Sequence, residues 1–365
     1  MTKIAFAFTI CAATERGKLA AKQITLGATV DYDRVKWWQF EPVVETSLEV
    51  MADRLRTLAL QPKRMIVMGA PLAGLDLNGR HLRRWANAET ATLTGPDRAW
   101  LPLDFDDVRV PKGLGCGQKL AEAALFVRDS LLPDEFRGVR MIAVPSANTG
   151  RRGDNIARLR LFAALDRPHP IRMMKDWTKG AASTLDLPID AAIIQTGQPI
   201  YTGRPVFVRS VRTVEGQDRR EGVEDPVPRA LHAVILPGDR DTVALVIDRF
   251  APKLAAIEAK VNHVARACGS NWRAFLDAAV GDDEGFFIPL TRGIGVAVRA
   301  EAHADEIEAT VTAILALRAD SGRRTRYGRS WILSTIESFR SRDDATRAAH
   351  KRALSRLFFE ETRAP

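Results

Sequence analysis

The chain has 365 residues, of which 46% are hydrophobic and 27% charged, and its formal net charge is +9 at pH 7. This composition excludes a disordered protein, and the length is sufficient for two domains with their own cores. The cysteines Cys11, Cys116 and Cys268 lie far apart without a CxxC pair, which predicts buried or free thiols in a reducing compartment rather than a zinc site. No apolar run is long enough for a membrane span or a convincing signal peptide, so we expect a cytoplasmic protein with no membrane partner.

The positive charge is concentrated in two regions. Residues 137–175 contain nine Lys or Arg and two Asp, and the second region is RRTRYGR at 323–329. Clustered cations favour a polyanionic partner, because neutralising phosphates releases condensed counterions. Basic residues that serve solubility alone are the alternative interpretation.

The hydrophobic patterns predict a mixture of helices and strands through about residue 210. Short apolar or alternating runs bounded by Gly, Pro, Asn and Asp indicate strands, and a 3.6-residue repeat indicates helices. In chain order, the predicted elements are a helix at 44–60, strands at 63–70 and 99–105, a helix at 117–132, and strands at 139–147, 156–165 and 189–195.

A charged stretch that contains prolines, residues 214–232, indicates a linker. The Ala- and Leu-rich segments that follow it have helical periodicity and little strand signal; they lie at 245–269, 304–320 and 343–361. We therefore predict an α+β domain over residues 1–215, a linker at 216–232 and an all-helical domain over residues 233–365.

The stretch AWLPLDFDDV at 99–108 places three aspartates in four positions of a basic chain. If this segment is a strand that ends at its aspartates, Asp104 and Asp106 project from one face while Phe105 enters the core on the other. The two carboxylates then emerge about 7 Å apart, which is close enough to converge on divalent cations. We expect Asp107 to point away and to begin the turn.

Two further segments supply matching chemistry. Residues 139–168 predict two strands joined by a polar loop, 148–155, whose glycines and arginines suit a phosphate-contacting turn, and Arg158 and Arg160 share one face of the second strand. Asp190 precedes another apolar run and is a third candidate carboxylate. Nucleotidyl transfer requires such a set, because paired Mg²⁺ or Mn²⁺ ions stabilise the attacking and leaving oxygens while cationic side chains hold the triphosphate.

The order of these motifs resembles the archaeo-eukaryotic primase superfamily, in the branch found on phages, plasmids and integrated elements. LDFD at 103–106, PSANTGRRGDNIARLRLF at 145–162 and ID at 189–190 look like motifs one, two and three, and DAAIIQTGQPIYTGRPVF at 190–207 is similar to the stretch after the third motif. The resemblance covers residues 60–210 and, more faintly, the helical region.

The resemblance implies a primase-like catalytic domain with an RRM-like core and a mixed or antiparallel sheet, followed by a helical domain. It implies catalytic metal-ligand roles for Asp104, Asp106 and Asp190, which would hold two Mg²⁺ or Mn²⁺ ions. The candidate nucleotide contacts on the motif-two segment are Ser146, Asn148, Thr149, Arg151, Arg152, Arg158 and Arg160. The family normally carries a histidine at the position of Arg160, and a guanidinium there can still hold a phosphate.

Some residues outside the motifs are also candidates. We expect His169 in a loop, and Trp37, Trp38 and Tyr201 either stack on bases or sugars or only pack in the core. In the C-terminal region, basic and aromatic side chains are candidates for template contacts, with a stabilising helical cap as the alternative. These template candidates are Arg323, Arg324, Arg326, Tyr327 and Arg329.

The sequence therefore predicts a DNA primase or primase-polymerase of a mobile genetic element, which makes primers from NTPs or dNTPs on a single-stranded DNA template. A metal-dependent nuclease would also need clustered aspartates and a basic groove, but it needs no triphosphate pocket. A non-catalytic replication initiator or single-stranded-DNA-binding protein on a decayed primase fold is the third interpretation. An Asp-x-Asp glycosyltransferase is disfavoured by the basic charge. Because the chain has no Walker loop, any replicative helicase partner is a separate polypeptide.

Overall fold

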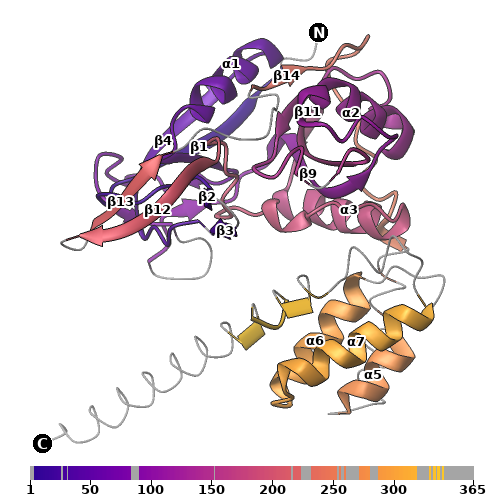
Figure 1. The fold of residues 1–365 in the computed structure, drawn as a ribbon. Coiled ribbons are helices and arrows are strands. Elements are labelled where there is room, and N and C mark those ends of the chain that lie inside the picture. The colour runs from indigo at the N-terminus through magenta and orange to yellow at the C-terminus, as the bar shows by residue number, and fades with distance from the viewer. Residues whose placement is uncertain are drawn as a thin grey trace, which may run out of the picture. The chain divides into compact units, whose positions relative to one another are not determined.

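The structure is a computed structural model that describes residues 4–340, except for 26–27, 31, 84–89, 152, 215–216, 223–231, 253–254, 256–258, 260–270, 280–286, 319–328, 330–331, 334 and 338. It divides into two compact units, Met1–Ala251 and Pro252–Pro365, each of which is considered by itself. The first unit combines helices with mainly antiparallel sheets, which confirms the predicted α+β class (Figure 1).

The strands described in the first unit are β1 (Phe6–Ala13), β2 (Gln23–Thr25), β3 (Ala28–Val30), β4 (Trp37–Glu45), β5 (Arg64–Val67), β6 (Ala70–Pro71), β7 (His81–Leu82), β8 (Leu93–Thr94), β9 (Arg98–Arg109), β10 (Ile142–Pro145), β11 (Ile156–His169), β12 (Val206–Val214), β13 (Gln217–Gly222) and β14 (Val234–Ile235). Its helices are α1 (Leu48–Ala59), α2 (Leu120–Phe126) and α3 (Ile171–Thr184), with short helical segments at Gly117–Lys119, Val127–Leu131, Asp134–Phe136 and Ala191–Ile193. The second unit contains α5 (Trp272–Ala279), α6 (Phe287–Arg299) and α7 (Ala304–Arg318).

The strands form four sheets with the orders β5-β1-β4-β7, β14-β10-β11-β9, β13-β12-β2-β3 and β6-β8. The pairing is antiparallel throughout these sheets except between β12 and β2, which run parallel. This parallel pair brings the N-terminal segment beside the chain that follows the third predicted motif, about 180 residues later, and it contributes to the site described below.

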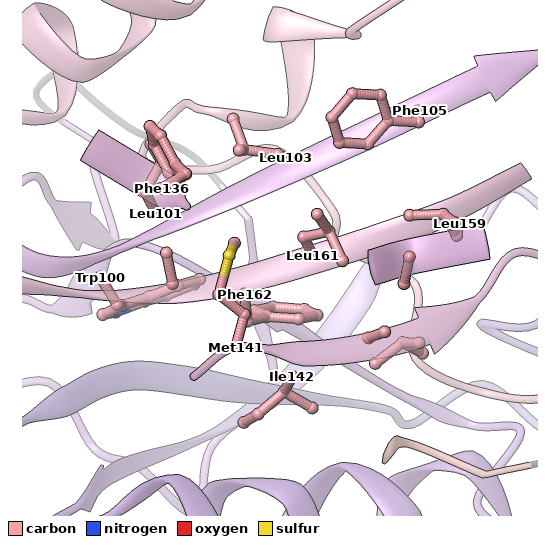
Figure 2. Close-up of a cluster of buried hydrophobic side chains, with 14 of the residues drawn as sticks. Trp100, Leu101, Leu103, Phe105, Phe136, Met141, Ile142, Leu159, Leu161 and Phe162 are labelled. Atoms are coloured by element: carbon pink, nitrogen blue, oxygen red, sulfur yellow. The ribbon is translucent and has the colours of Figure 1, made fainter. Parts of the chain in front are cut away.

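The central pair of the second sheet, β9 and β11, carries most of the predicted site. One face of this pair enters the main hydrophobic core, where Leu103, Phe105, Leu159 and Leu161 are all 0% exposed (Figure 2). Because side chains alternate along a strand, residues 104, 106, 158 and 160 lie on the opposite face. The predicted alternation of aspartates and apolar residues is therefore observed.

A β-bulge interrupts this pair beside the aspartates. Ala157 pairs with Val108 and Leu159 pairs with Phe105, so that Asp106 and Asp107 together oppose Arg158. The extra residue is accommodated by Asp107, whose φ of 58° lies in the left-handed region. β9 thus continues to Arg109. The expectation that the strand ends at its aspartates is therefore wrong.

Helix α1 packs against the sheet β5-β1-β4-β7 and contributes side chains to the main hydrophobic core (Figure 1). The hydroxyl of Ser47 caps its N-terminus by accepting a hydrogen bond from the backbone N–H of Val50 at 3.2 Å. Glu49 in the first turn and Arg56 in the last complement the helix dipole. The buried residues follow the helical repeat that predicted this helix: Leu48, Met51, Ala52, Leu55, Leu58 and Ala59.

Several predicted boundaries differ from the structure. The predicted strand at 189–195 forms only a single bridge, between Ile189 and Phe105, and then a short helix. The predicted linker at 216–232 contains β13, and the predicted helical domain starts too early at 233, because β14, Leu236, Val243 and Phe250 belong to the core of the first unit. The apolar runs at 233–236 and 243–247 are short, so the sequence pattern alone does not distinguish a strand of the first unit from the start of a helix.

The described elements of the second unit are helical, and their buried side chains form a separate cluster around Leu276, Ile294 and Val311. No helix among the described residues combines the length and the apolar character needed to cross a membrane.

Candidate functional site

A cavity of about 280 Å³ lies on the polar face of β9 and β11. Its walls come from the two strands, from the turn after β10, from the segment between α3 and β12, and from the chain around β2. The polar and aromatic residues that line it are Lys22, Tyr32, Asp104, Asp106, Ser146, Asn148, Arg158, Arg160, Asp190, Gln198, Tyr201, Thr202 and Arg204.

Asp104 and Arg160 are cross-strand partners and form an ion pair inside this cavity. Arg160 Nη2 donates to Asp104 Oδ2 at 2.7 Å, and Arg160 Nη1 donates to the backbone carbonyl of Tyr201 at 3.0 Å. The two charged side chains are only 12% and 14% exposed. The guanidinium is therefore held by one carboxylate and one carbonyl, with little contact with water.

Arg158 is paired differently, because the bulge presents two carboxylates to it. Its Nη2 lies 2.7 Å from Asp106 Oδ1 and its Nε lies 3.0 Å from Asp107 Oδ1. Asp107 does not line the cavity but contacts the same guanidinium as Asp106, which corrects the expectation that it points away.

Asp190 reaches the cavity through backbone pairing with β9. The backbone N–H of Asp190 donates to the carbonyl of Asp104 at 2.9 Å, and the N–H of Asp106 donates to the carbonyl of Pro188 at 2.9 Å. The Asp190 side chain caps the short helix after it, accepting from the N–H of Ala192 at 2.8 Å. All three candidate carboxylates therefore line one cavity, and Asp190 lies beside a bridge and not in a regular strand.

Two of the three carboxylates have pKa values raised above the usual range of an aspartate. The pKa of Asp106 is raised to about 6, first by burial and then by the charges of Asp104, Asp190 and Asp107, while Arg158 acts in the opposite direction. Burial also raises the pKa of Asp190, opposed by the hydrogen bond from Ala192. A cation bound between these groups would relieve the repulsion.

The donor chemistry fits a hard divalent cation, since carboxylate oxygens are the ligands that Mg²⁺ and Mn²⁺ prefer. One oxygen of each carboxylate, namely Asp104 Oδ1, Asp106 Oδ2 and Asp190 Oδ2, takes part in none of the contacts above. In their present arrangement, however, no three Asp, Glu, His or Cys side chains of the described residues are spaced to hold a metal ion. Metal binding would therefore require some of these side chains to move.

The predicted phosphate-contacting residues separate into two groups. Ser146 and Asn148 line the cavity with Arg158 and Arg160. Thr149 instead donates its hydroxyl to the carbonyl of Arg158, and the guanidinium of Arg151 lies over the ring of Phe207 at 5.3 Å, so neither lines the cavity. Arg152 lies outside the described residues.

Sequence reasoning missed five polar residues of the cavity: Lys22, Tyr32, Gln198, Thr202 and Arg204. The rings of Tyr32 and Tyr201 stack with a centroid distance of 3.6 Å and an interplanar angle of 7°, and Lys22 Nζ lies 5.7 Å from the Tyr32 ring centroid. Burial raises the pKa of Tyr32, so this hydroxyl remains protonated. No local pattern marks the N-terminal residues, because the pairing of β2 with β12 brings them to the site.

The other predicted contacts receive little structural information. Arg329 forms an ion pair with Glu308 at 3.1 Å, whereas Arg323, Arg324, Arg326 and Tyr327 lie outside the described residues. Trp38 is buried, and Trp37 is 38% exposed with the Arg80 guanidinium 5.6 Å from its ring centroid.

His169 is buried at the end of β11, not in a loop as expected. β11 runs through Pro168 and ends at His169, directly before Pro170. The two prolines therefore lie at the end of a strand and do not form a loop around the histidine.

Comparisons with known proteins add little to this geometry. No protein-family model matches the sequence, and no curated protein matches it at a significant level. Among solved structures, the chain is similar to primase RepB' with 8% identity and a TM-score of 0.27, over 92% of this chain and 89% of that one. A TM-score of this size does not define the fold, and the interpretation of the site rests on its own residues.

Proposed function

We propose that the chain is a primase-type nucleotidyltransferase that joins NTPs or dNTPs on a single-stranded DNA template with the help of Mg²⁺ or Mn²⁺. One observation carries this proposal: three carboxylates and two arginines from separate predicted motifs line the same cavity. Carboxylates alone would serve many metal enzymes, but buried arginines beside them also supply the fixed cations that a triphosphate requires.

The cavity residues would divide the work by charge. Asp104, Asp106 and Asp190 would hold the cations, which when bound would activate the attacking hydroxyl and stabilise the leaving pyrophosphate. Arg158 and Arg160 would neutralise and orient the phosphates, because guanidinium groups pair with phosphate oxygens in a fixed geometry. Lys22 and Arg204 add positive charge at the same cavity, and the stacked pair of Tyr32 and Tyr201 offers an aromatic wall for a base or sugar.

The direct test is primer synthesis by the full chain on unprimed single-stranded DNA, with labelled NTPs or dNTPs and Mg²⁺ or Mn²⁺. We expect template-dependent products from the wild type and none from Asp104→Asn or Asp106→Asn. Asp53→Asn is the matched control, because Asp53 is an exposed carboxylate on α1 that pairs with Arg56 outside the cavity. This control should retain full synthesis.

Other outcomes would overturn the proposal in favour of specific alternatives. Metal-dependent cleavage of the template DNA, followed with an end-labelled template in a parallel reaction, without synthesis would identify a nuclease. Binding of single strands that is insensitive to EDTA, without synthesis or cleavage, would identify a non-catalytic DNA-binding protein.

A further inference from the structure

The arginines of the cavity occupy the carboxylates that the proposed function assigns to metal ions. The ion pair between Asp104 and Arg160 is more buried than the contact of Arg158 with its carboxylates, since both of its side chains are less than 15% exposed. A guanidinium remains charged at all physiological pH values, so it neutralises Asp104 permanently while the two are in contact. Breaking such a pair is costly unless both partners receive new ones.

We propose that Arg160 is a positioning residue that moves between Asp104 and the nucleotide. In the free protein it neutralises Asp104; when a divalent cation and a triphosphate bind together, the cation takes its place at Asp104 and the guanidinium pairs with a phosphate. This inference rests on the proposed function, because it assigns the metal and the triphosphate to the same cavity.

The contacts of the two arginines show why Arg160, and not Arg158, is the one that moves. Arg158 is held by the carboxylates of both Asp106 and Asp107, at 2.7 Å and 3.0 Å. Arg160 is held by one carboxylate and one neutral carbonyl, and this difference in counterions makes it the less firmly paired of the two. Its Nε, like that of Arg158, is buried with no hydrogen-bond partner among the described residues. A phosphate could accept from this unpaired donor, and a guanidinium can pair with two phosphate oxygens at once.

This exchange makes the binding of metal and of nucleotide interdependent. Without nucleotide, a metal ion must displace Arg160 and leave it without a counterion. Without metal, a triphosphate must draw Arg160 away from Asp104 and leave that carboxylate unpaired. Each ligand therefore removes the penalty on the other, and the coupling is reciprocal.

Two single variants of the full chain test the two halves of this mechanism. In Arg160→Gln the competitor for the metal is absent, so Mn²⁺ alone, followed by the EPR signal of the free ion, should bind roughly tenfold more tightly than to the wild type. In Asp104→Asn the competitor for the phosphates is absent, so ATP in EDTA, followed by equilibrium dialysis, should bind more tightly by a similar factor.

The neighbouring arginine provides a control for charge alone. Arg158→Gln removes the same charge from the same cavity, but its effect on Mn²⁺ affinity should be several-fold smaller than that of Arg160→Gln. Arg54→Gln, which breaks an ion pair with Glu45 outside the cavity, should leave Mn²⁺ affinity unchanged. Thermal melting of each variant establishes that it is folded, and if one of the two test variants unfolds, the other still tests the mechanism.

Equal Mn²⁺ affinities in Arg160→Gln and Arg158→Gln would overturn the inference, because they would show a general charge effect. Unchanged ATP affinity in Asp104→Asn would also overturn it. These outcomes are distinct from failure of the proposed function. If the wild type makes no primers but Arg160→Gln gains Mn²⁺ affinity and Asp104→Asn gains ATP affinity, the nucleotidyl transfer is refuted and the exchange is supported.

Discussion

Replacing Phe105 tests whether β9 presents its aspartates to the cavity as the structure shows. Phe105 lies between Asp104 and Asp106, and its ring is 0% exposed, whereas the side chain of Asp106 is 53% exposed. Phe105→Ala removes an aromatic ring from the core and should lower the free energy of unfolding by about 3–5 kcal/mol. Asp106→Ala shortens a half-exposed side chain and should lower the free energy of unfolding by less than about 1 kcal/mol, because a carboxylate whose pKa is raised does not stabilise the folded state when it is charged.

Urea denaturation followed by tryptophan fluorescence measures this difference, because Trp100 and Trp177 are buried in the same core. With an m-value of about 3 kcal/mol/M, the Phe105→Ala midpoint should fall by roughly 1–2 M. A loss below about 1 kcal/mol for Phe105→Ala, or a larger loss for Asp106→Ala, would refute the reasoning. Either result would mean that the strand register is shifted by one residue, which would turn both aspartates into the core.

Three further predictions concern titration and packing. The pKa of Asp106 is raised to about 6, so protonation of this group stabilises the folded state at low pH, and the contribution is lost as the pH rises through 6. The stability of Asp106→Asn relative to the wild type should therefore increase from pH 4 to pH 7, as measured by urea titrations at each pH. Burial lowers the pKa of His169 below 6.5, so the folded state resists its protonation and wild-type stability should fall as the pH drops below 6.5. His169→Gln should reduce the slope of the free energy of unfolding against pH in this range. Equal slopes in the two proteins would contradict this assignment. In Gly180→Ala the new Cβ would lie 2.4 Å from Cβ of Phe250, so thermal or urea unfolding should show a loss of about 1–3 kcal/mol. No loss would mean that Phe250 does not pack against α3 as the structure shows.

The sequence predicted those features that depend on short-range alternation. The spacing of Asp104, Phe105 and Asp106 was enough to assign each side chain to a face, because a strand has a period of two. The helical repeat of residues 44–60 likewise predicted α1, which the structure places at Leu48–Ala59. In both cases the prediction depends only on residues that are close together in the sequence.

The features that the sequence did not predict depend on distant pairing. Lys22 enters the cavity because β2 pairs with β12, and the backbone N–H of Val206 donates to the carbonyl of Lys22 at 2.9 Å. The boundary of the first unit was placed too early because β14 has only two residues and pairs with β10. The bulge at Asp107 was missed for a related reason: an extra residue in one strand is defined only by the register of its partner.

The strand register also explains why the role of Arg160 cannot be considered apart from that of Asp104. Asp104 and Arg160 are directly opposite in the antiparallel pair, so the side chain at position 160 is the nearest cross-strand neighbour of the first candidate metal ligand. A histidine at this position would carry a charge that depends on pH and could be neutral beside a bound cation, whereas an arginine competes with a cation at every pH. The chain therefore places a permanent positive charge where the proposed chemistry places a metal ion. Under the exchange proposed above, nucleotidyl transfer at this site begins with separation of these two side chains, and the strength of that ion pair sets the concentration of metal and nucleotide at which the site can assemble.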